Sequence, residues 1–369
     1  MRGRQRAIES RPHRFLMMAG LVLAALCLAG CQPSTAPAAA PVVPHTSVTT
    51  SAETPTVPPK PTPASPADLA ASRLAVTKPY PPLGQASTVH PGVLEYTVTL
   101  PRDAGSTLAR IYVPTGPIRG KLPCLMIAPT GSRLFNGANL QPADQNEHLT
   151  YARAGFAVVA YQTDGALAPT DDPAASARAA RAFMDAEAGV ANERAALDYA
   201  LARIPGIDPS RVFAVGDGPA GTVALLAAAR DPRIRACAVC APVCDPATNL
   251  ASVIPTLDGV IPGYRAFIQW SSPAEHPEEL PCPVFLFHAD DDDVVPLGEI
   301  EPYIASLKAT NRHVTYSSVH SGGHYLGTIY NGIPRAVAWM ESLPARESAA
   351  VSQPVRLHHA QPAPPPGQK

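Results

Sequence analysis

The sequence predicts one α/β domain with a mostly parallel central sheet and helices on both faces. Three observations support this prediction: short continuous apolar runs recur along the chain, segments of helical composition separate them, and one run leads through a glycine-rich turn into a helix. Continuous apolar runs are typical of central parallel strands, because helices cover such strands on both faces. The chain has 369 residues, enough for one large core, and its formal net charge of -1 gives no indication of a nucleic-acid partner.

The strands are expected in regular succession from residue 90 onward. Val93–Leu100 and Ala109–Val113 are joined by a turn at residues 102–105. The remaining strands are predicted from apolar runs at Cys124–Ala128, Phe156–Tyr161, Val212–Val215, Ile234–Ala241, Val284–His288 and Val314–Val319.

Helical segments fill the spaces between these strands. The Ala-rich stretch Ala177–Arg203 predicts one or two helices packed on the sheet. An irregular segment is expected from Cys244 to Pro281. The other helices are expected at Asn146–Ala154, in the Ala/Leu-rich run that ends before Asp231, at Leu297–Thr310 and at His324–Ser342.

The first 31 residues read as a targeting segment. Basic residues precede an apolar run from Phe15 to Ala29, and the run ends Leu28-Ala29-Gly30-Cys31. That ending resembles a bacterial lipobox, which implies that Cys31 is acylated, for example with palmitate, and becomes the mature N-terminus. An ordinary signal peptide or a short membrane anchor is the alternative. Each buried methylene of an acyl chain contributes about 0.8 kcal/mol, so we expect a lipid-anchored protein of the bacterial cell envelope, outside the cytoplasm.

Two Pro-rich segments flank the predicted domain, which we assign to residues 85–344. Residues 32–84 consist largely of Pro, Ala, Thr and Ser, and residues 345–369 form a polar tail. Neither segment has enough large apolar side chains to offset the entropy of ordering. We therefore expect both to be disordered, the first as a semi-extended tether between the membrane and the domain.

The stretch Arg211–Asp231 organises the domain. It reads RVFAVGDGPAGTVALLAAARD, which predicts a buried strand, a tight glycine-rich turn and a helix. Strand, sharp turn and helix form the context of a nucleophile elbow, G-x-S-x-G. The position of the serine is occupied by Gly218, which has no side chain.

Two further motifs follow the elbow. Phe287–Pro296 reads FHADDDDVVP, and Ser321–His324 reads SGGH. With the elbow they make residues from about 90 to 343 resemble an α/β-hydrolase of the prolyl-oligopeptidase and dienelactone-hydrolase-like branch. The first of them is similar to H-G-x-x-D-x-x-V-P after the seventh strand and aligns Asp292 with the triad acid. The second is similar to the glycine-flanked catalytic histidine, here His324. The resemblance implies the α/β-hydrolase fold and a serine peptidase or esterase type of site.

The resemblance assigns Asp292 and His324 to a vestigial acid–histidine pair. In an active relative the serine attacks a carbonyl, the histidine takes its proton and the carboxylate orients the imidazole. The alternatives are a solvated acidic loop that attracts a cation, for Asp292, and a histidine at a helix start, for His324. Without a serine at position 218 the loss in turnover is on the order of 10⁶.

The predicted oxyanion region is altered as well. One donor should be the backbone N–H of the residue after the nucleophile, but Pro219 has no N–H. Loss of one such donor costs about 3 kcal/mol. The second donor would come from Thr130 or Gly131, in a loop without the H-G-G form. Asp217 lies one residue before the nucleophile position of the G-x-S-x-G pattern, so we do not assign it as a nucleophile. We expect it to be solvated or paired with His324.

Five cysteines remain besides Cys27 and Cys31. We expect them to be buried and unreactive, although an oxidising compartment would allow a disulfide between Cys240 and Cys244. No cofactor and no metal site is expected. His358 and His359, in the tail, are interpreted as solvated.

Three functions fit these observations. The preferred one is a membrane-tethered pseudoenzyme that binds a small-molecule or peptide ligand and no nucleic acid. The second is an active peptide or ester hydrolase that uses an unconventional nucleophile or an activated water. The third is a structural envelope lipoprotein.

Overall fold

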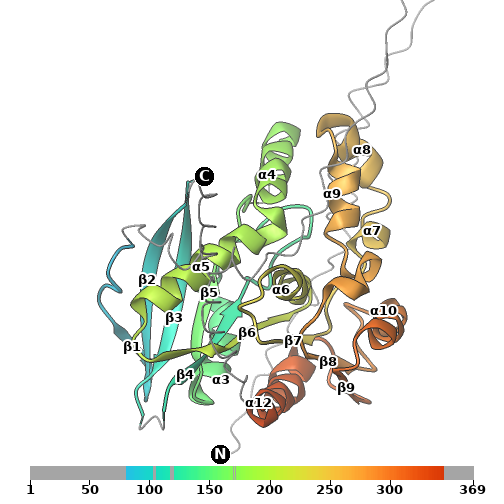
Figure 1. The fold of residues 1–369 in the computed structure, drawn as a ribbon. Coiled ribbons are helices and arrows are strands. Elements are labelled where there is room, and N and C mark those ends of the chain that lie inside the picture. Colours follow the sequence, from blue (N-terminus) through green and yellow to red (C-terminus); the bar gives the residue numbers. More distant parts are fainter. Residues whose placement is uncertain (1–79, 103–104, 117–119, 169, 171, 345–369) are drawn as a thin grey trace, which may run out of the picture.

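The computed structural model describes residues 80–102, 105–116, 120–168, 170 and 172–344. Within these residues nine strands form one sheet in the order β1-β2-β3-β5-β4-β6-β7-β8-β9. The strands β1 to β3 pair antiparallel, as do β3 and β5, whereas all pairs from β5 through β4 to β9 are parallel. Figure 1 shows this sheet running through the molecule with helices on both sides, so the predicted fold class is confirmed.

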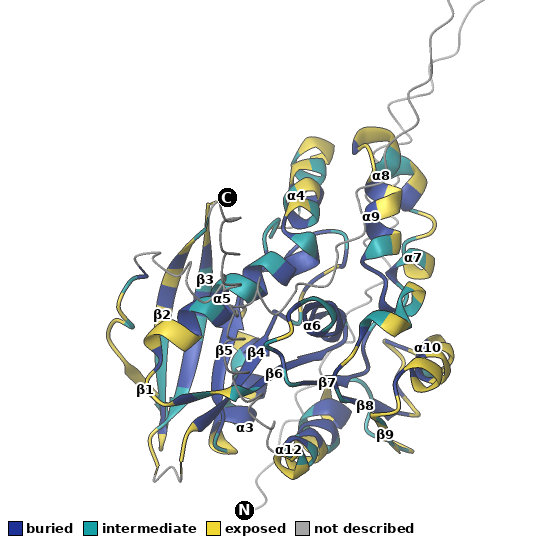
Figure 2. Ribbon diagram, in the orientation of Figure 1, coloured by how far each residue is buried: buried dark blue, intermediate teal, exposed yellow. Residues whose placement is uncertain are grey.

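Every strand expected from the sequence is present, and one short edge strand, β1, was not expected. The central strands β4, β5, β7 and β8 are buried along their whole length, as their continuous apolar runs predicted (Figure 2). The strands are β1 Ser87–His90, β2 Val93–Arg102, β3 Gly105–Pro114, β4 Leu122–Ile127, β5 Ala157–Tyr161, β6 Ile207–Asp217, β7 Ala236–Cys240, β8 Val284–Ala289 and β9 Val314–Val319.

Helices cover the two faces of the sheet separately. One face packs against α5, α6 and α10, and the opposite face packs against α3 and α12. Alternate residues of β6 serve the two layers, because Ala214 belongs to the first core and Val215 to the second. These helices are α3 Gln145–Arg153, α5 Val190–Arg203, α6 Pro219–Arg230, α10 Leu297–Thr310 and α12 Ile333–Ser342.

The expectation of an irregular segment from Cys244 to Pro281 is wrong. The segment holds α7 Pro246–Asn249, α8 Ile254–Val260 and α9 Tyr264–Trp270, followed by two short 3₁₀ turns. A proline lies in the first turn of α7, of α8 and of both 3₁₀ turns, a position where its fixed φ favours helix. In Figure 1, α8 and α9 lie beside α4 (Pro173–Asp185), and Phe183 of α4 contacts Phe267 of α9 edge to face at 6.2 Å.

The stretch Ala177–Arg203 was expected to form one or two helices and forms two, whereas the single helix expected at His324–Ser342 is interrupted. The stretch 177–203 forms α4 and α5, separated by a 3₁₀ turn, Glu187–Gly189, in which all three residues have positive φ. The helix expected at His324–Ser342 instead comprises α11 (Tyr325–Gly327), a π-helical turn (Thr328–Gly332) and α12.

The structure tests two further predictions, the state of the cysteines and the start of the domain. Cys124, Cys237, Cys240, Cys244 and Cys282 are all buried free thiols, so the Cys240–Cys244 disulfide is not formed. Tyr80, which we had assigned to the tether, is buried and packs its ring on Tyr199 at 5.7 Å.

The predicted signal segment, Cys31, most of the tether and the tail with His358 and His359 lie outside the described residues. Within the described part, no helix has both the length and the apolarity needed to cross a membrane.

Candidate active site at the strand–helix elbow

Gly218 forms the turn between β6 and α6. Its backbone has φ 52° and ψ −124°, a region that costs glycine little and strains other residues. The N–H of Gly218 donates to the carbonyl of Cys240 at 3.0 Å, which fixes the end of β6 against β7. A Cβ atom built on Gly218 would meet only His324 within 4 Å, with Nε2 at 3.2 Å and Cε1 at 3.5 Å. A side chain at this position would therefore point at the imidazole.

The elbow is tight because α6 lies directly on the strand that precedes it. A Cβ on Gly216 would come within 2.4 Å of the Ala220 carbonyl carbon and 2.5 Å of its oxygen. The first turn of α6 can thus approach β6 only where residue 216 has no side chain. This geometry therefore requires glycine at position 216.

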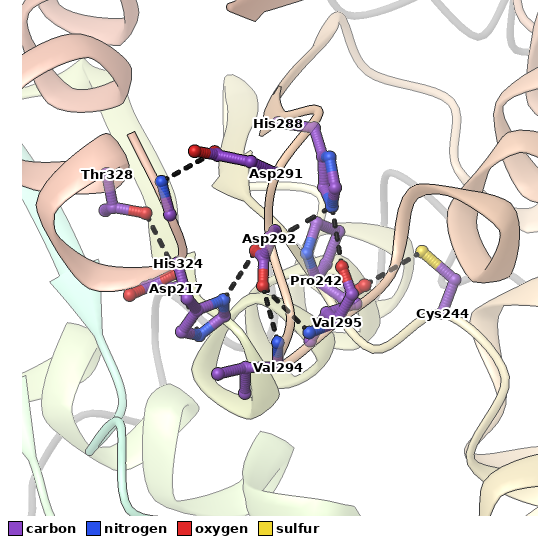
Figure 3. A network of polar contacts seen from close by, with 11 residues as sticks. Asp217, Pro242, Cys244, His288, Asp291, Asp292, Val294, Val295, His324 and Thr328 are labelled. Carbon is purple, nitrogen blue, oxygen red and sulfur yellow. Dashed lines mark hydrogen bonds and ion pairs between the residues drawn. The ribbon is translucent and has the colours of Figure 1, made fainter. Parts of the chain in front are cut away.

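Asp292 and His324 are hydrogen-bonded. Nδ1 of His324 lies 2.7 Å from Oδ2 of Asp292, whose other oxygen accepts from the backbone N–H groups of Val294 and Val295, each at 2.9 Å (Figure 3). The Asp292 side chain is only 1% exposed, so it does not belong to a solvated acidic loop. Burial acts to raise the pKa of Asp292, but the hydrogen bonds from His324 and Val295 outweigh it and leave that pKa below its usual value.

The loops that carry these two residues are tied together. Asp291 accepts hydrogen bonds from the backbone N–H groups of Gly322 and Gly323 at 3.2 and 2.8 Å. His288, which opens the acidic motif, is fully buried and its Nε2 donates to the carbonyl of Val295 at 2.8 Å. These contacts hold the Asp292 loop against the His324 loop (Figure 3).

Asp217 faces the other nitrogen of the imidazole. Its Oδ1 lies 3.8 Å from Nε2 of His324 and accepts a hydrogen bond from Thr328 Oγ1 at 3.1 Å. The side chain is 4% exposed, so of the two expectations for Asp217, solvation is wrong and proximity to His324 is observed. Burial raises the pKa of Asp217 to about 6, against the opposing charge of His324.

His324 itself is mostly enclosed, with 17% of its side chain exposed. Burial acts to lower its pKa. The hydrogen bond to Asp292 and the charges of Asp217 and Asp292 act the other way, and together they raise the pKa of His324 above its usual value.

The predicted oxyanion region contains carboxyl groups. Pro219 opens α6 and offers no N–H, and the Thr130 hydroxyl donates to Asp144 at 2.9 Å. Gly131 is exposed. Glu147 of α3 is fully buried, and one of its oxygens has no hydrogen-bond partner. Its pKa is raised well above the usual value by burial, and further by the charge of Asp217.

Sequence reasoning missed Glu147 and the burial of Asp217. Glu147 lies in the first turn of a polar helix, where an acidic residue is ordinary, and nothing in the local pattern marks it as buried. Asp217 follows the apolar run of β6, and this position at the carboxyl end of a central strand was the available signal.

One group outside the elbow has the composition of a metal site. In the part of the chain that the structure describes, ligand atoms of His276, Glu278 and Glu279 all lie within 4.8 Å of one another. Glu279 is also 3.6 Å from Arg230, so one of the three ligands is already engaged by a cation.

Comparison with known families agrees with this geometry. Residues 183–343 match the prolyl oligopeptidase family, peptidase S9, and this range contains Gly218, Asp292 and His324. This match covers part of the domain, and the nine-stranded, mostly parallel sheet with helices on both faces has the α/β-hydrolase fold. The predicted fold and the resemblance of its three motifs are thereby confirmed. A search of curated proteins found no match.

Solved structures share the fold of this α/β-hydrolase domain. The Pyrococcus horikoshii acylaminoacyl peptidase is 16% identical with a TM-score of 0.53, over 68% of this chain and 41% of that one. A Mycobacterium tuberculosis puromycin-hydrolyzing peptidase is 19% identical with a TM-score of 0.53, over 69% and 40%. An acetyl xylan esterase from Paenibacillus sp. R4 is 18% identical with a TM-score of 0.50, over 76% and 96%. The match therefore spans less than half of the two peptidases and nearly all of the esterase.

Proposed function

We propose that this α/β-hydrolase domain no longer hydrolyses and instead binds a small-molecule or peptide ligand at its former active site. The observation that carries the proposal is Gly218, which lies in the elbow turn where a side chain would meet Nε2 of His324 at 3.2 Å. Glycine has no atom that can attack a carbonyl, so no covalent intermediate can form there.

The surroundings of Gly218 support the same proposal. Stabilising an oxyanion requires donors aimed at the developing charge. Pro219 removes one donor, and the Thr130 hydroxyl is committed to Asp144. The buried carboxyl group of Asp217 nearby also disfavours negative charge on a substrate.

Exposed apolar side chains near the site favour a ligand. Of the large apolar residues that the described part of the chain leaves exposed, Val294 follows Asp292, and Tyr325 and Leu326 follow His324 directly. Tyr330, which is 72% exposed, lies four residues after Leu326. A contiguous exposed apolar patch commonly marks a contact surface. Peptides are among the ligand classes because two structural neighbours are named peptidases.

A fluorophosphonate probe tests the loss of the nucleophile. We expect no labelling of the wild-type protein and little labelling of Gly218→Ser, because Pro219 still withholds a donor. The double variant Gly218→Ser with Pro219→Ala should label faster than Gly218→Ser by on the order of tenfold to a thousandfold. This is the rate effect expected of one oxyanion donor. The readout is labelling rate by intact mass. Stoichiometric labelling of the wild type that disappears in His324→Ala would refute the proposal.

A hydrolase that activates water is the second candidate. The observation that favours it is the 2.7 Å hydrogen bond between Asp292 and His324. If His324 acts as the base that activates water, this hydrogen bond would orient its imidazole. In that case the wild type cleaves p-nitrophenyl acetate and His324→Ala loses the activity. Turnover that is unchanged in His324→Ala would exclude this candidate.

We also propose that the domain is tethered to a membrane of the bacterial cell envelope through lipid on Cys31. The lipobox-like sequence and the Pro-rich stretch before the domain support this. A purely structural envelope lipoprotein is the remaining alternative, and ligand binding at the elbow would argue against it.

A further inference from the structure

The imidazole of His324 has a carboxylate on each of its two nitrogens. Asp292 accepts a hydrogen bond from Nδ1 at 2.7 Å, and Asp217 lies 3.8 Å from Nε2. In a working triad the second nitrogen faces a neutral hydroxyl, whose proton it must accept. Here that nitrogen faces a buried acid.

Asp217 is held in this position by its own contacts. It is the last residue of β6, and Thr328, on the π-helical turn that follows the His324 loop, donates its hydroxyl to Asp217 Oδ1 at 3.1 Å. Both side chains are buried. The distance between Asp217 and His324 therefore follows from the packing of the elbow strand against the helical segment after His324, and not from a mobile surface contact.

The charged groups around His324 have one sign. Those that act on it are Asp292 and Asp293 from the loop after β8 and Asp217 from β6, and all are carboxylates. Behind Asp217, Glu147 and Asp144 belong to the α3 side of the site. Opposite charges within about 4–6 Å favour the charged form of a titratable group.

We infer that Asp217 is a positioning residue that holds His324 as the doubly protonated imidazolium, where a triad needs the neutral imidazole. This rests on the proposed function, because an imidazolium has no free lone pair on Nε2 to accept a proton. It adds a loss that is independent of Gly218 and Pro219. It also gives the elbow an N–H donor directed at the space beside Gly218, where a ligand acceptor would be recognised.

The competing interpretation is that Asp217 is itself neutral and has only a packing role. Burial does favour the neutral acid. An ionised Asp217, 3.8 Å from Nε2, stabilises a proton on that nitrogen, whereas a neutral Asp217 does not. The two interpretations differ in what happens to His324 when the charge of Asp217 is removed.

The protonation of His324 is measurable by NMR in the folded protein without any ligand. With histidines labelled in ¹⁵N and ¹³C, the His324 signal is identified by its loss in His324→Gln and titrated from pH 5 to 9. We expect Asp217→Asn to lower the pKa of His324 by about one unit or more, a tenfold weaker proton affinity. The amide can still accept the Thr328 hydroxyl, so the local packing is retained.

Asp293→Asn is the matched control. It removes the same charge from an exposed residue that acts on His324 less strongly. We expect it to shift the pKa of His324 by less than about 0.3 unit, since exposed charges are screened. Thr328→Val is a second variant, which leaves the charge of Asp217 but frees its orientation, and it should lower the pKa by an intermediate amount.

An unchanged pKa in both Asp217→Asn and Thr328→Val, with the Nδ1 proton still bound to Asp292, would overturn the inference. Its failure is distinguishable from that of the proposed function. A wild type that hydrolyses esters and still shows the drop in Asp217→Asn refutes only the loss of catalysis. An inert wild type with an unchanged pKa refutes only the role of Asp217.

Discussion

At the scale of single residues, the candidate site has glycine where the G-x-S-x-G pattern has serine, and it has a buried carboxyl group, Asp217, beside His324. Gly218, Asp292 and His324 could be found from the sequence because each lies in a motif with fixed spacing. Asp217 and Glu147 could not be assigned in this way. These two residues were selected because they are buried beside groups that are distant in the chain, and a local sequence pattern does not show such contacts.

Glu147 should make stability depend on pH. Its pKa in the folded protein is raised by burial, so the folded state binds more protons than the unfolded state above the unfolded pKa of about 4.3. The free energy of unfolding therefore falls as pH rises through that window. We expect Glu147→Met to unfold at higher urea than wild type, with a gain of about 1–3 kcal/mol near pH 7 and much less near pH 4.

The control for this prediction is Glu301→Met, on the exposed side of α10. It should change the free energy of unfolding little and without this dependence on pH. If Glu147→Met gave the same change at pH 4 and pH 8, the raised pKa of Glu147 would be wrong.

At the scale of elements, the order of strands and helices followed from the apolar runs, whereas the short helices did not. α7 to α9 are too short for a helical period to stand out, and tertiary contacts such as that between Phe183 and Phe267 stabilise them. The sequence allowed two helices over 177–203 but did not give the position of the break between them, for a related reason. Positive φ at Glu187 and Ala188 is set by packing, because neither residue favours it.

The elbow itself gives the sharpest prediction at this scale. Gly216→Ala should destabilise the domain by about 1–3 kcal/mol or more, because its Cβ would overlap the backbone of Ala220 and push α6 from β6. Gly298→Ala is the matched control on α10, where no atom lies within 4 Å of the added Cβ and a gain of up to about 1 kcal/mol is expected. Urea unfolding of the two variants measures the difference. Equal stability would contradict the close approach of α6.

At the scale of the whole molecule, the fold class was predictable because three motifs occur in family order on alternating strands and helices. The placement of the domain on a tether remains a prediction. The residues concerned, including Cys31, lie outside the part that the structure describes.

Cys31→Ser tests the tether. In a bacterial host the full chain should take up radioactive palmitate and sediment with membranes, and Cys31→Ser should do neither with mature protein. Cys27→Ser, within the apolar run, should behave as wild type. Soluble, unlabelled wild-type protein would instead indicate an ordinary signal peptide.

The five buried thiols of the described residues have a consequence for oxidation of the domain. The thiolate is the form that reacts with oxidants. Burial raises the pKa of Cys124 to about 12 and also raises the pKa values of Cys237, Cys240 and Cys244, so these four thiols are unreactive in the native state. Only an unfolded chain exposes them, and an odd number of thiols leaves at least one to couple with another molecule. The resistance of this domain to oxidative cross-linking therefore depends on how small a fraction of the molecules is unfolded.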